Sequence, residues 1–148
     1  MSELADRLQA DMTAALKARD ELRLSTLRMV RSALQYARVA KRADLTEDDV
    51  LAVLAREAKQ RRESAEEFTK GNRPELAAKE EAEGRVIAEY LPRPLSDTEI
   101  EALLTEAVGA TGATSPQDLG KVMSWLSSRV KGRVDGRRLS ELVRQRLQ

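Results

Sequence analysis

The stretch from Arg56 to Pro92 constrains the fold most, because its pattern predicts two helices that fold back on each other. Gly71 suits the end of one helix and Pro74 the first turn of the next, so the turn is expected near residue 72. Inward positions step by three and four on both sides of that turn. They are Leu51, Leu54, Ala58, Arg61, Ala65 and Phe68 on the first side, and Leu76, Glu80, Glu83, Ile87 and Tyr90 on the second. The stretch therefore predicts a long antiparallel hairpin.

Charged residues interrupt the middle of these two apolar rows. A turn near residue 72 sets Arg61 opposite Glu83, and Ser64 opposite Glu80. A buried charge without a partner costs several kcal/mol, whereas a paired and hydrogen-bonded one costs much less. We therefore predict a structural pair of Arg61 with Glu83, with Glu80 in the same seam. The alternative is a half-exposed row whose charges are simply solvated.

The composition predicts an all-α fold. Of the 148 residues, 34% are charged and 3% are aromatic, while glycine and proline are scarce and stand at a few junctions. No strand pattern of period two and no internal repeat is found. The absence of cysteine and histidine excludes disulfides, zinc sites of the usual ligand types, and thiol or imidazole catalysis.

Further helices are predicted on both sides of the hairpin. Two precede it, at about 3–18 and 20–41, and Thr46 with Asp49 resembles a capping box for the helix that enters the hairpin. Ser96 with Glu99 is a capping box for a fifth helix, expected to end at about residue 108. A sixth is expected from Ser115 to the glycine at 132, and a last one is expected after residue 135.

The segment Leu91 to Leu95 contains two prolines and is the best domain boundary. Each proline lacks an N–H and disfavours helix at the preceding residue, so the fourth helix must stop here. The length allows one domain or two small ones. We predict an N-terminal four-helix subdomain, residues 1–91, with the long hairpin, and a smaller C-terminal three-helix subdomain, residues 96–148.

Near the N-terminus no continuous apolar run is found, because acidic and basic residues interrupt the first sixteen positions. We therefore expect neither a signal peptide nor a membrane span, no membrane partner, and a cytoplasmic location.

The sequence predicts no catalytic residues, no metal site and no cofactor. The many carboxylates show no spacing that separates an acid–base pair from surface charge. Glu80, Glu81 and Glu83 could hold magnesium only with further oxygen ligands, so pairing with Arg61 and Lys79 is the favoured interpretation. No phosphate loop or dinucleotide fingerprint occurs.

Basic residues are the remaining signal, and they fall into two groups. Residues 115–148 carry eight basic and three acidic side chains. The main candidate nucleic-acid contact surrounds the loop before the last helix and is made of Lys131, Arg133, Arg137 and Arg138, assisted by Lys121. The stripe of Arg28, Arg31 and Arg38 described next is expected to assist it. The alternative is that these charges serve solubility alone.

The second group is a stripe on the helix expected at 20–41. Arg28, Arg31, Arg38 and Arg42 fall on one side, with Gln35 between them. This stripe is a candidate anion-binding surface or, alternatively, a solvated face without a ligand. Trp125 is interpreted as the rim of a core rather than a base-stacking platform. With so few aromatic residues, sequence-specific reading of single strands is not expected.

Several segments together carry a family resemblance over essentially the whole chain. They are EAKQRRES at 57–64, RPELA at 73–77, YLP at 90–92, GKVM at 120–123 and GRVDGR at 132–137, with Glu80, Glu83 and Ile87 between them. In these segments the chain resembles the GatB/YqeY family. Members are two-part helical proteins, either free-standing or forming the tail of the B subunit of the tRNA-dependent amidotransferase.

The resemblance implies affinity for tRNA more than catalysis. In the amidotransferase the tail contacts tRNA, while a separate and larger region holds the catalytic site. The family-level activity is carbon–nitrogen ligation with glutamine as amido donor, and it would be assigned to this chain only through the family. This chain is not expected to be catalytic alone.

Three hypotheses follow. The first is a tRNA-binding accessory module, acting with an amidotransferase or another tRNA-handling enzyme. The second is a protein-interaction module whose basic surface binds an acidic protein and no RNA. The third is an amide-forming subunit active only in a complex.

Overall fold

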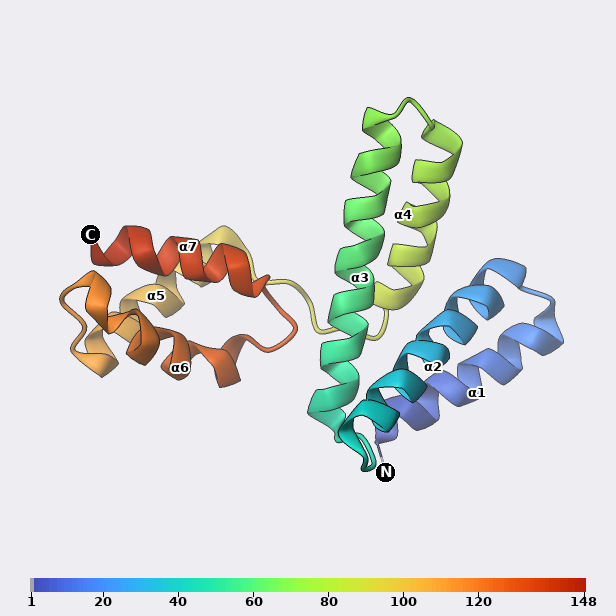
Figure 1. Ribbon diagram of the computed structural model, residues 1–148, viewed down its shortest axis with the longest axis horizontal. Coiled ribbons are helices and arrows are strands. Elements are labelled where there is room, and N and C mark those ends of the chain that lie inside the picture. Colours follow the sequence, from blue (N-terminus) through green and yellow to red (C-terminus); the bar gives the residue numbers. More distant parts are fainter. Residues whose placement is uncertain (1) are drawn as a thin grey trace. The chain divides into compact units, whose positions relative to one another are not determined.

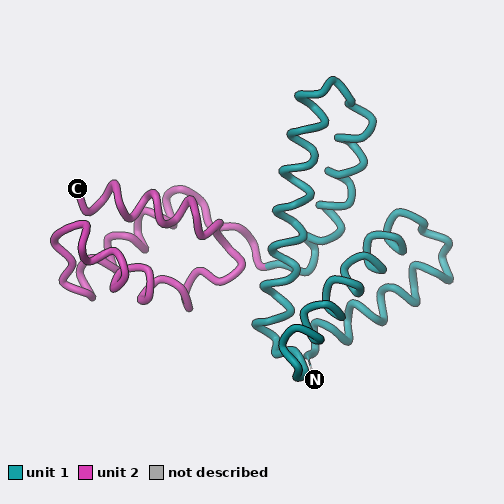
Figure 2. Tube along the Cα trace, viewed as in Figure 1, with its two compact units in different colours: residues 1–91 teal, residues 92–148 magenta. Residues whose placement is uncertain are grey.

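The computed structural model describes residues 2–148, which fold into seven α-helices and one short 3₁₀ turn with no strand among them (Figure 1). The predicted all-α fold class is confirmed. The chain divides into two compact units, residues 1–91 and 92–148, each with its own hydrophobic core (Figure 2). The helices of the first unit are α1 (Glu3–Ala18), α2 (Glu21–Lys41), α3 (Glu47–Lys70) and α4 (Pro74–Ala88).

Helices α1 and α2 form an antiparallel pair with a very short connection. Arg19 adopts a left-handed conformation with φ 58°, and the N–H of Asp20 donates to the carbonyl of Ala15 at 3.0 Å, which closes α1. The carboxylate of Asp20 then accepts from the N–H of Arg23 at 3.2 Å and caps α2. One residue thus ends one helix and starts the next, and the two helices pack side by side.

The predicted hairpin consists of α3 and α4, which run antiparallel. At its turn the N–H of Arg73 donates to the carbonyl of Phe68 at 2.8 Å, and the N–H of Asn72 to that of Thr69 at 3.1 Å. This is the Schellman pattern of helix ends. The left-handed residue is Asn72, with φ 57°, and not Gly71, whose φ is −81°. Asparagine tolerates this conformation better than most residues.

Arg61 is buried in the seam between α3 and α4, with 8% of its surface exposed. Its Nε lies 3.5 Å from a carboxylate oxygen of Glu80 and 3.6 Å from one of Glu83. Its Nη2 lies 3.9 Å from Glu57, one helical turn earlier. Neither the Nε of Arg61 nor the Oε2 of Glu80 makes a hydrogen bond. The cluster is therefore held by charge attraction among one guanidinium and three carboxylates.

The core of the first unit lies where α1 and α2 pack against the half of the hairpin that is farther from its turn. Its fully buried members are Leu27, Val30, Val50, Leu54 and Ile87, each at most 2% exposed. Beyond the Arg61 cluster, the seam is closed by small residues instead, Ala65 and Ala77, both buried. Arg61 thus marks the boundary between the main core and the tip of the hairpin.

The second unit comprises α5 (Asp97–Thr111), the 3₁₀ turn η1 (Pro116–Asp118), α6 (Leu119–Val130) and α7 (Gly136–Leu147). Its core centres on Leu104, Val122, Leu126 and Val143, all at most 1% exposed.

Two helix boundaries in the second unit differ from the prediction. Helix α5 passes through Gly109 and ends at Gly112, which adopts a positive φ of 68°. A single glycine costs a helix only about 1 kcal/mol, too little to end it. Helix α6 starts at residue 119 rather than near Ser115, because Pro116 opens a separate 3₁₀ turn.

The proline-rich segment 92–95 belongs to the second unit, where it is strapped to the loop before α7. The N–H of Leu95 donates to the carbonyl of Arg133 at 2.9 Å, and the Nε of Arg133 donates to the carbonyl of Arg93 at 2.9 Å. Gly132, with φ 70°, lies against the ring of Pro92. We call this arrangement the strap. The predicted start of the second unit, residue 96, leaves the strap out.

The strap predicts how fragments behave. Residues 92–148 are expected to fold alone, because their core contacts are internal, whereas residues 96–148 should be less stable by about 2 kcal/mol through loss of the strap's hydrogen bonds and packing. Urea unfolding of both fragments, followed by circular dichroism, measures the difference. Equal stability of the two would show that the strap contributes nothing.

The Arg61 cluster predicts an asymmetric mutational response. Arg61→Leu leaves two buried carboxylates and the half-buried Glu80 uncompensated and should cost about 3 kcal/mol or more. Glu83→Leu should cost less, because Glu57 and Glu80 still face the guanidinium. The double variant should be more stable than the sum of the two single losses implies. A double-mutant cycle by urea denaturation gives this coupling energy, and a value near zero would contradict the assigned interaction.

Candidate nucleic-acid interface

The outward face of α2 carries a row of arginines. Helix α2 buries Leu27 and Val30 toward the core, and the side of the helix next to this buried face is open to solvent. Steps of three and four along a helix keep residues on one side. Arg28, Arg31, Arg38 and Arg42 are spaced in this way, with Gln35 filling the gap, and all five are exposed. We call the four arginines the α2 stripe.

Three arginines of the α2 stripe have no internal partner. Arg38 forms an ion pair with Asp44 at 3.0 Å, but both side chains are more than two-thirds exposed. Such surface pairs contribute little and are weakened by salt. Within residues 2–148, the side chains of Arg28, Arg31 and Arg42 make no ion pair or hydrogen bond. The stripe therefore presents positive charge that the fold does not neutralise.

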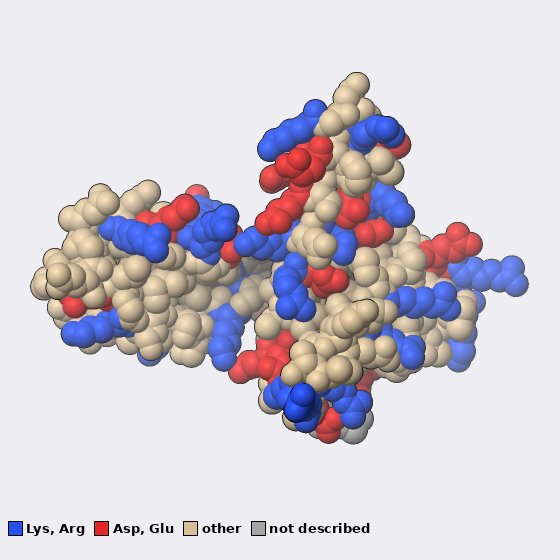
Figure 3. Space-filling model, in the orientation of Figure 1, with Lys and Arg blue, Asp and Glu red and all other residues tan. Residues whose placement is uncertain are grey.

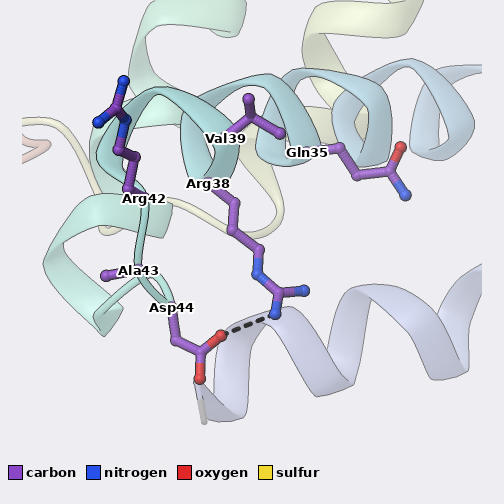
Figure 4. Close-up of a pocket in the computed structure, with 6 residues that line it drawn as sticks. All are labelled: Gln35, Arg38, Val39, Arg42, Ala43 and Asp44. Atoms are coloured by element: carbon purple, nitrogen blue, oxygen red, sulfur yellow. Dashed lines mark ion pairs between the residues drawn. The ribbon is translucent and has the colours of Figure 1, made fainter.

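An open depression lies at the C-terminal end of α2, with a volume of about 660 Å³ (Figure 4). It is lined by Gln35, Arg38, Val39, Arg42, Ala43 and Asp44. In Figure 4 the Arg38 side chain points toward Asp44, whereas Val39 and Arg42 project away from it. Arg42 holds the left-handed conformation, with φ 61°, that ends α2. The depression is thus a charged surface hollow at the end of the stripe.

Helix α2 is held against the hairpin by charged contacts on its other side. The guanidinium of Arg23 donates to both carboxylate oxygens of Glu89, the shorter contact being 2.6 Å, and this lowers the pKa of Glu89. Nearby, the hydroxyl of Tyr90 donates to Asp11 at 2.5 Å. Burial, together with this hydrogen bond, raises the pKa of Tyr90. These contacts join α4 to α1 and α2 and fix which side of α2 faces outward.

In the other predicted contact, in the C-terminal unit, most of the basic side chains already pair with other residues of the same chain. Arg138 pairs with Asp97 at 2.7 Å, and Arg133 is half-buried in the strap, 3.6 Å from Glu99. Lys131 is exposed and also interacts within the chain. Of the predicted arginines here, Arg137 is exposed and has no side-chain partner among the described residues.

Lys121 does not join this group. It stands in the first turn of α6 and pairs weakly with Asp118 at 3.8 Å, whereas Lys131 follows the last turn. Ten residues of helix separate the two by about 15 Å. The structure gathers Lys131, Arg133, Arg137 and Arg138 at one end of α6 and leaves Lys121 at the other.

Other charged surfaces look different. Figure 3 shows acidic and basic side chains together along the α3–α4 hairpin. Trp125 is partly buried against the second core, and its ring is covered by the guanidinium of Arg129 at 3.7 Å. None of the groups of acidic residues at positions 2–148 has the arrangement of a metal site. Nor does any helix there combine the length and apolar character needed to cross a bilayer.

Comparison with known proteins decides the family. The model of the family described as Yqey-like protein matches residues 5–147, nearly the whole chain. The chain belongs to this family. The predicted resemblance is therefore confirmed for the YqeY part, and the buried Arg61 and the strap are features of a YqeY-like chain.

Fungal relatives share the YqeY-like sequence. "Altered inheritance of mitochondria protein 41, mitochondrial" of Lachancea thermotolerans is 34% identical over 125 residues, covering 80% of this chain and 67% of that protein. The protein of the same name from Vanderwaltozyma polyspora is 28% identical over 80% of this chain and 68% of its own. The one from Pyrenophora tritici-repentis is 27% identical over 94% and 78%.

These names correct one expectation. We expected a cytoplasmic protein, from the absence of an apolar run near residue 1, but the curated YqeY-like relatives are named as mitochondrial proteins. The cytoplasmic assignment is therefore wrong. An apolar run marks secretion and membrane insertion and carries no information about other compartments.

The acid sensitivity of the second unit follows from Glu99. Hydrogen bonds from Arg93, and then from Ser96, lower the pKa of Glu99 from 4.5 to about 2. A carboxylate whose pKa is lowered by folding stabilises the fold at any pH above the pKa that it has in the unfolded chain. This stabilisation is lost as the pH falls from about 4.5 toward 2. Glu99→Gln should therefore be less stable than the parent at pH 7, and the difference should shrink in acid.

Fluorescence of Trp125 measures this effect, because it is the only tryptophan and lies in the second unit. Urea unfolding at several pH values gives the stability difference. Glu106→Gln, an exposed change on the same helix, is the control. A difference between Glu99→Gln and the parent that stays constant down to pH 2 would refute the role of Glu99.

Proposed function

We propose that this chain is an accessory module that binds tRNA through its phosphate backbone, with the α2 stripe as the principal contact. The observation that carries the proposal is the set of three exposed arginines on one helical face without internal partners. Free guanidinium groups bind phosphate oxygens with paired, charge-assisted hydrogen bonds. Because the chain carries its basic residues in distinct stretches while its net charge is only +1, attraction to an anion has to be local.

The length of the stripe suits a nucleic-acid backbone. Arg28 and Arg42 stand fourteen residues apart, which is about 21 Å along a helix. Several successive phosphates of one strand can meet a row of that length. Binding of this kind recognises shape and backbone, and is tolerant of sequence.

The C-terminal group is proposed as an auxiliary contact rather than the main one. Arg133 and Arg138 would have to give up Glu99 and Asp97 to reach a phosphate, whereas Arg137 would not. Carbon–nitrogen ligase chemistry with glutamine as donor is placed in a partner enzyme, such as an amidotransferase or another tRNA-handling enzyme. This chain would help present the tRNA to it.

The test compares two triple variants with the same change of charge. Arg28, Arg31 and Arg42 are replaced by Gln in one, and the exposed hairpin residues Arg56, Arg62 and Arg85 in the other. Affinity for unmodified tRNA is measured by fluorescence anisotropy at several salt concentrations. Removing one arginine that binds a phosphate should lower the slope of log affinity against log salt by about 0.7–0.9. The slope should fall by about two to three for the α2 variant, and it should hardly change for the hairpin variant.

Three other outcomes decide against parts of the proposal. Equal weakening by both variants would mean diffuse electrostatics without a site. A third variant, Arg137→Gln, tests the C-terminal group: a loss of affinity in this variant but not in the α2 variant would make that group the main contact. If the parent protein does not bind tRNA at about 150 mM salt, where typical nucleic-acid binders still do, the alternative of an acidic protein partner takes its place.

A further inference from the structure

The two most exposed large apolar side chains among the described residues are neighbours on α2. Tyr36 is 80% exposed and Val39 is 76% exposed. Single exposed apolar residues are ordinary and need no explanation. These two lie one helical turn apart on a helix whose inner side is fully packed, so they form a patch that the fold itself does not use.

The patch lies on the side of α2 next to the α2 stripe, about a quarter of a turn around the helix from it. Ser32, Tyr36 and Val39 step by four and three and are all exposed, so they form a second row along α2. Gln35 and Val39, four residues apart, connect the two rows at the hollow described above. One row of α2 is therefore cationic, and the adjacent row offers a hydroxyl, an aromatic ring and an aliphatic side chain.

Tyr36 is the aromatic residue whose ring remains open within residues 2–148. Tyr90 is buried, bonded to Asp11, and has the guanidinium of Arg7 4.5 Å from its ring centre. The ring of Trp125 is covered by Arg129, and Phe68 is partly buried in the hairpin. The open ring and the unpaired arginines are thus carried by the same helix, on neighbouring sides of it.

We propose that Tyr36 stacks on one unpaired base of an RNA whose phosphates lie on the α2 stripe. This inference rests on the proposed function and names its substrate class, an RNA helix interrupted by an unpaired nucleotide. A nucleotide carries its phosphate and its base at opposite ends, which suits two adjacent rows of different chemistry. The positive charge of the α2 stripe favours a polyanion as the ligand. The exposed ring of Tyr36 favours a polyanion whose bases have free aromatic faces.

A single ring accepts any base, so the contact adds affinity without reading sequence. Stacking of one base on an aromatic side chain typically strengthens binding by a factor of about ten. Ser32, one turn before Tyr36, places a hydroxyl where a ribose 2′-hydroxyl can pair with it, and such contacts distinguish RNA from DNA.

The test uses the full chain and two RNA probes. One is a blunt RNA duplex, and the other is the same duplex with a single unpaired adenosine at its centre. The parent protein should bind the bulged RNA about tenfold more tightly than the duplex. Tyr36→Leu, which keeps an apolar side chain and a good helix former, should abolish this preference, and Tyr36→Phe should retain it. The salt slope should be unchanged in both variants.

The outcomes separate this inference from the proposed function. If both RNAs bind equally and the Tyr36 variants match the parent, stacking is overturned while backbone binding stands. If Tyr36→Leu keeps the preference, the contact is apolar packing and the stacking proposal fails. If neither RNA binds, the proposed function itself fails. Binding of a polyglutamate peptide that depends on Tyr36, without any preference for the bulged RNA, would make α2 a protein-docking face and overturn the proposal.

Discussion

The first unit depends on a single buried cation. The seam between α3 and α4 is lined with small residues at Ala58, Ala65 and Ala77, which would pack nearly as well if one helix slid along the other. Arg61 removes that freedom, because the carboxylates of Glu80 and Glu83 meet its guanidinium in one register only. Burying such a cluster adds little net stability. We infer that its role here is to specify the register of the hairpin. Since α2 packs against this hairpin, the direction in which its arginines face follows from the same register.

Arginine has two different roles in the two units. In the second unit, Arg93, Arg133, Arg138 and Arg146 are paired with carboxylates of α5, and they hold the strap and α7 in place. In the first unit, three of the four arginines on the outer face of α2 pair with nothing in the described chain. The number of basic residues in a stretch is thus a poor guide to function. What matters is how many remain unpaired after folding.

The sequence was sufficient to predict the helices, the hairpin and the facing of Arg61 and Glu83, because these follow from periodicity and a single turn. Glu57 could also have been found, as it precedes Arg61 by one helical turn. The internal partners of the C-terminal cations could not, because Asp97 lies 41 positions before Arg138 and only the tertiary fold brings them together. The persistence of α5 through Gly109 was missed for a related reason: packing outweighs the propensity of one residue. The exposure of Tyr36 likewise depends on what the other helices leave uncovered.

Arg42 combines two properties that ordinarily exclude each other. Its left-handed backbone, φ 61°, is the conformation in which glycine is the least strained residue, and a long side chain there costs about 1 kcal/mol. A protein selected only for stability would place glycine at this position. Arg42 is exposed and its side chain makes no ion pair or hydrogen bond within residues 2–148, and Arg19, which ends α1 with φ 58°, shares its left-handed backbone. Glycine in place of Arg42 would therefore make the protein more stable and would remove one positive charge from the end of α2.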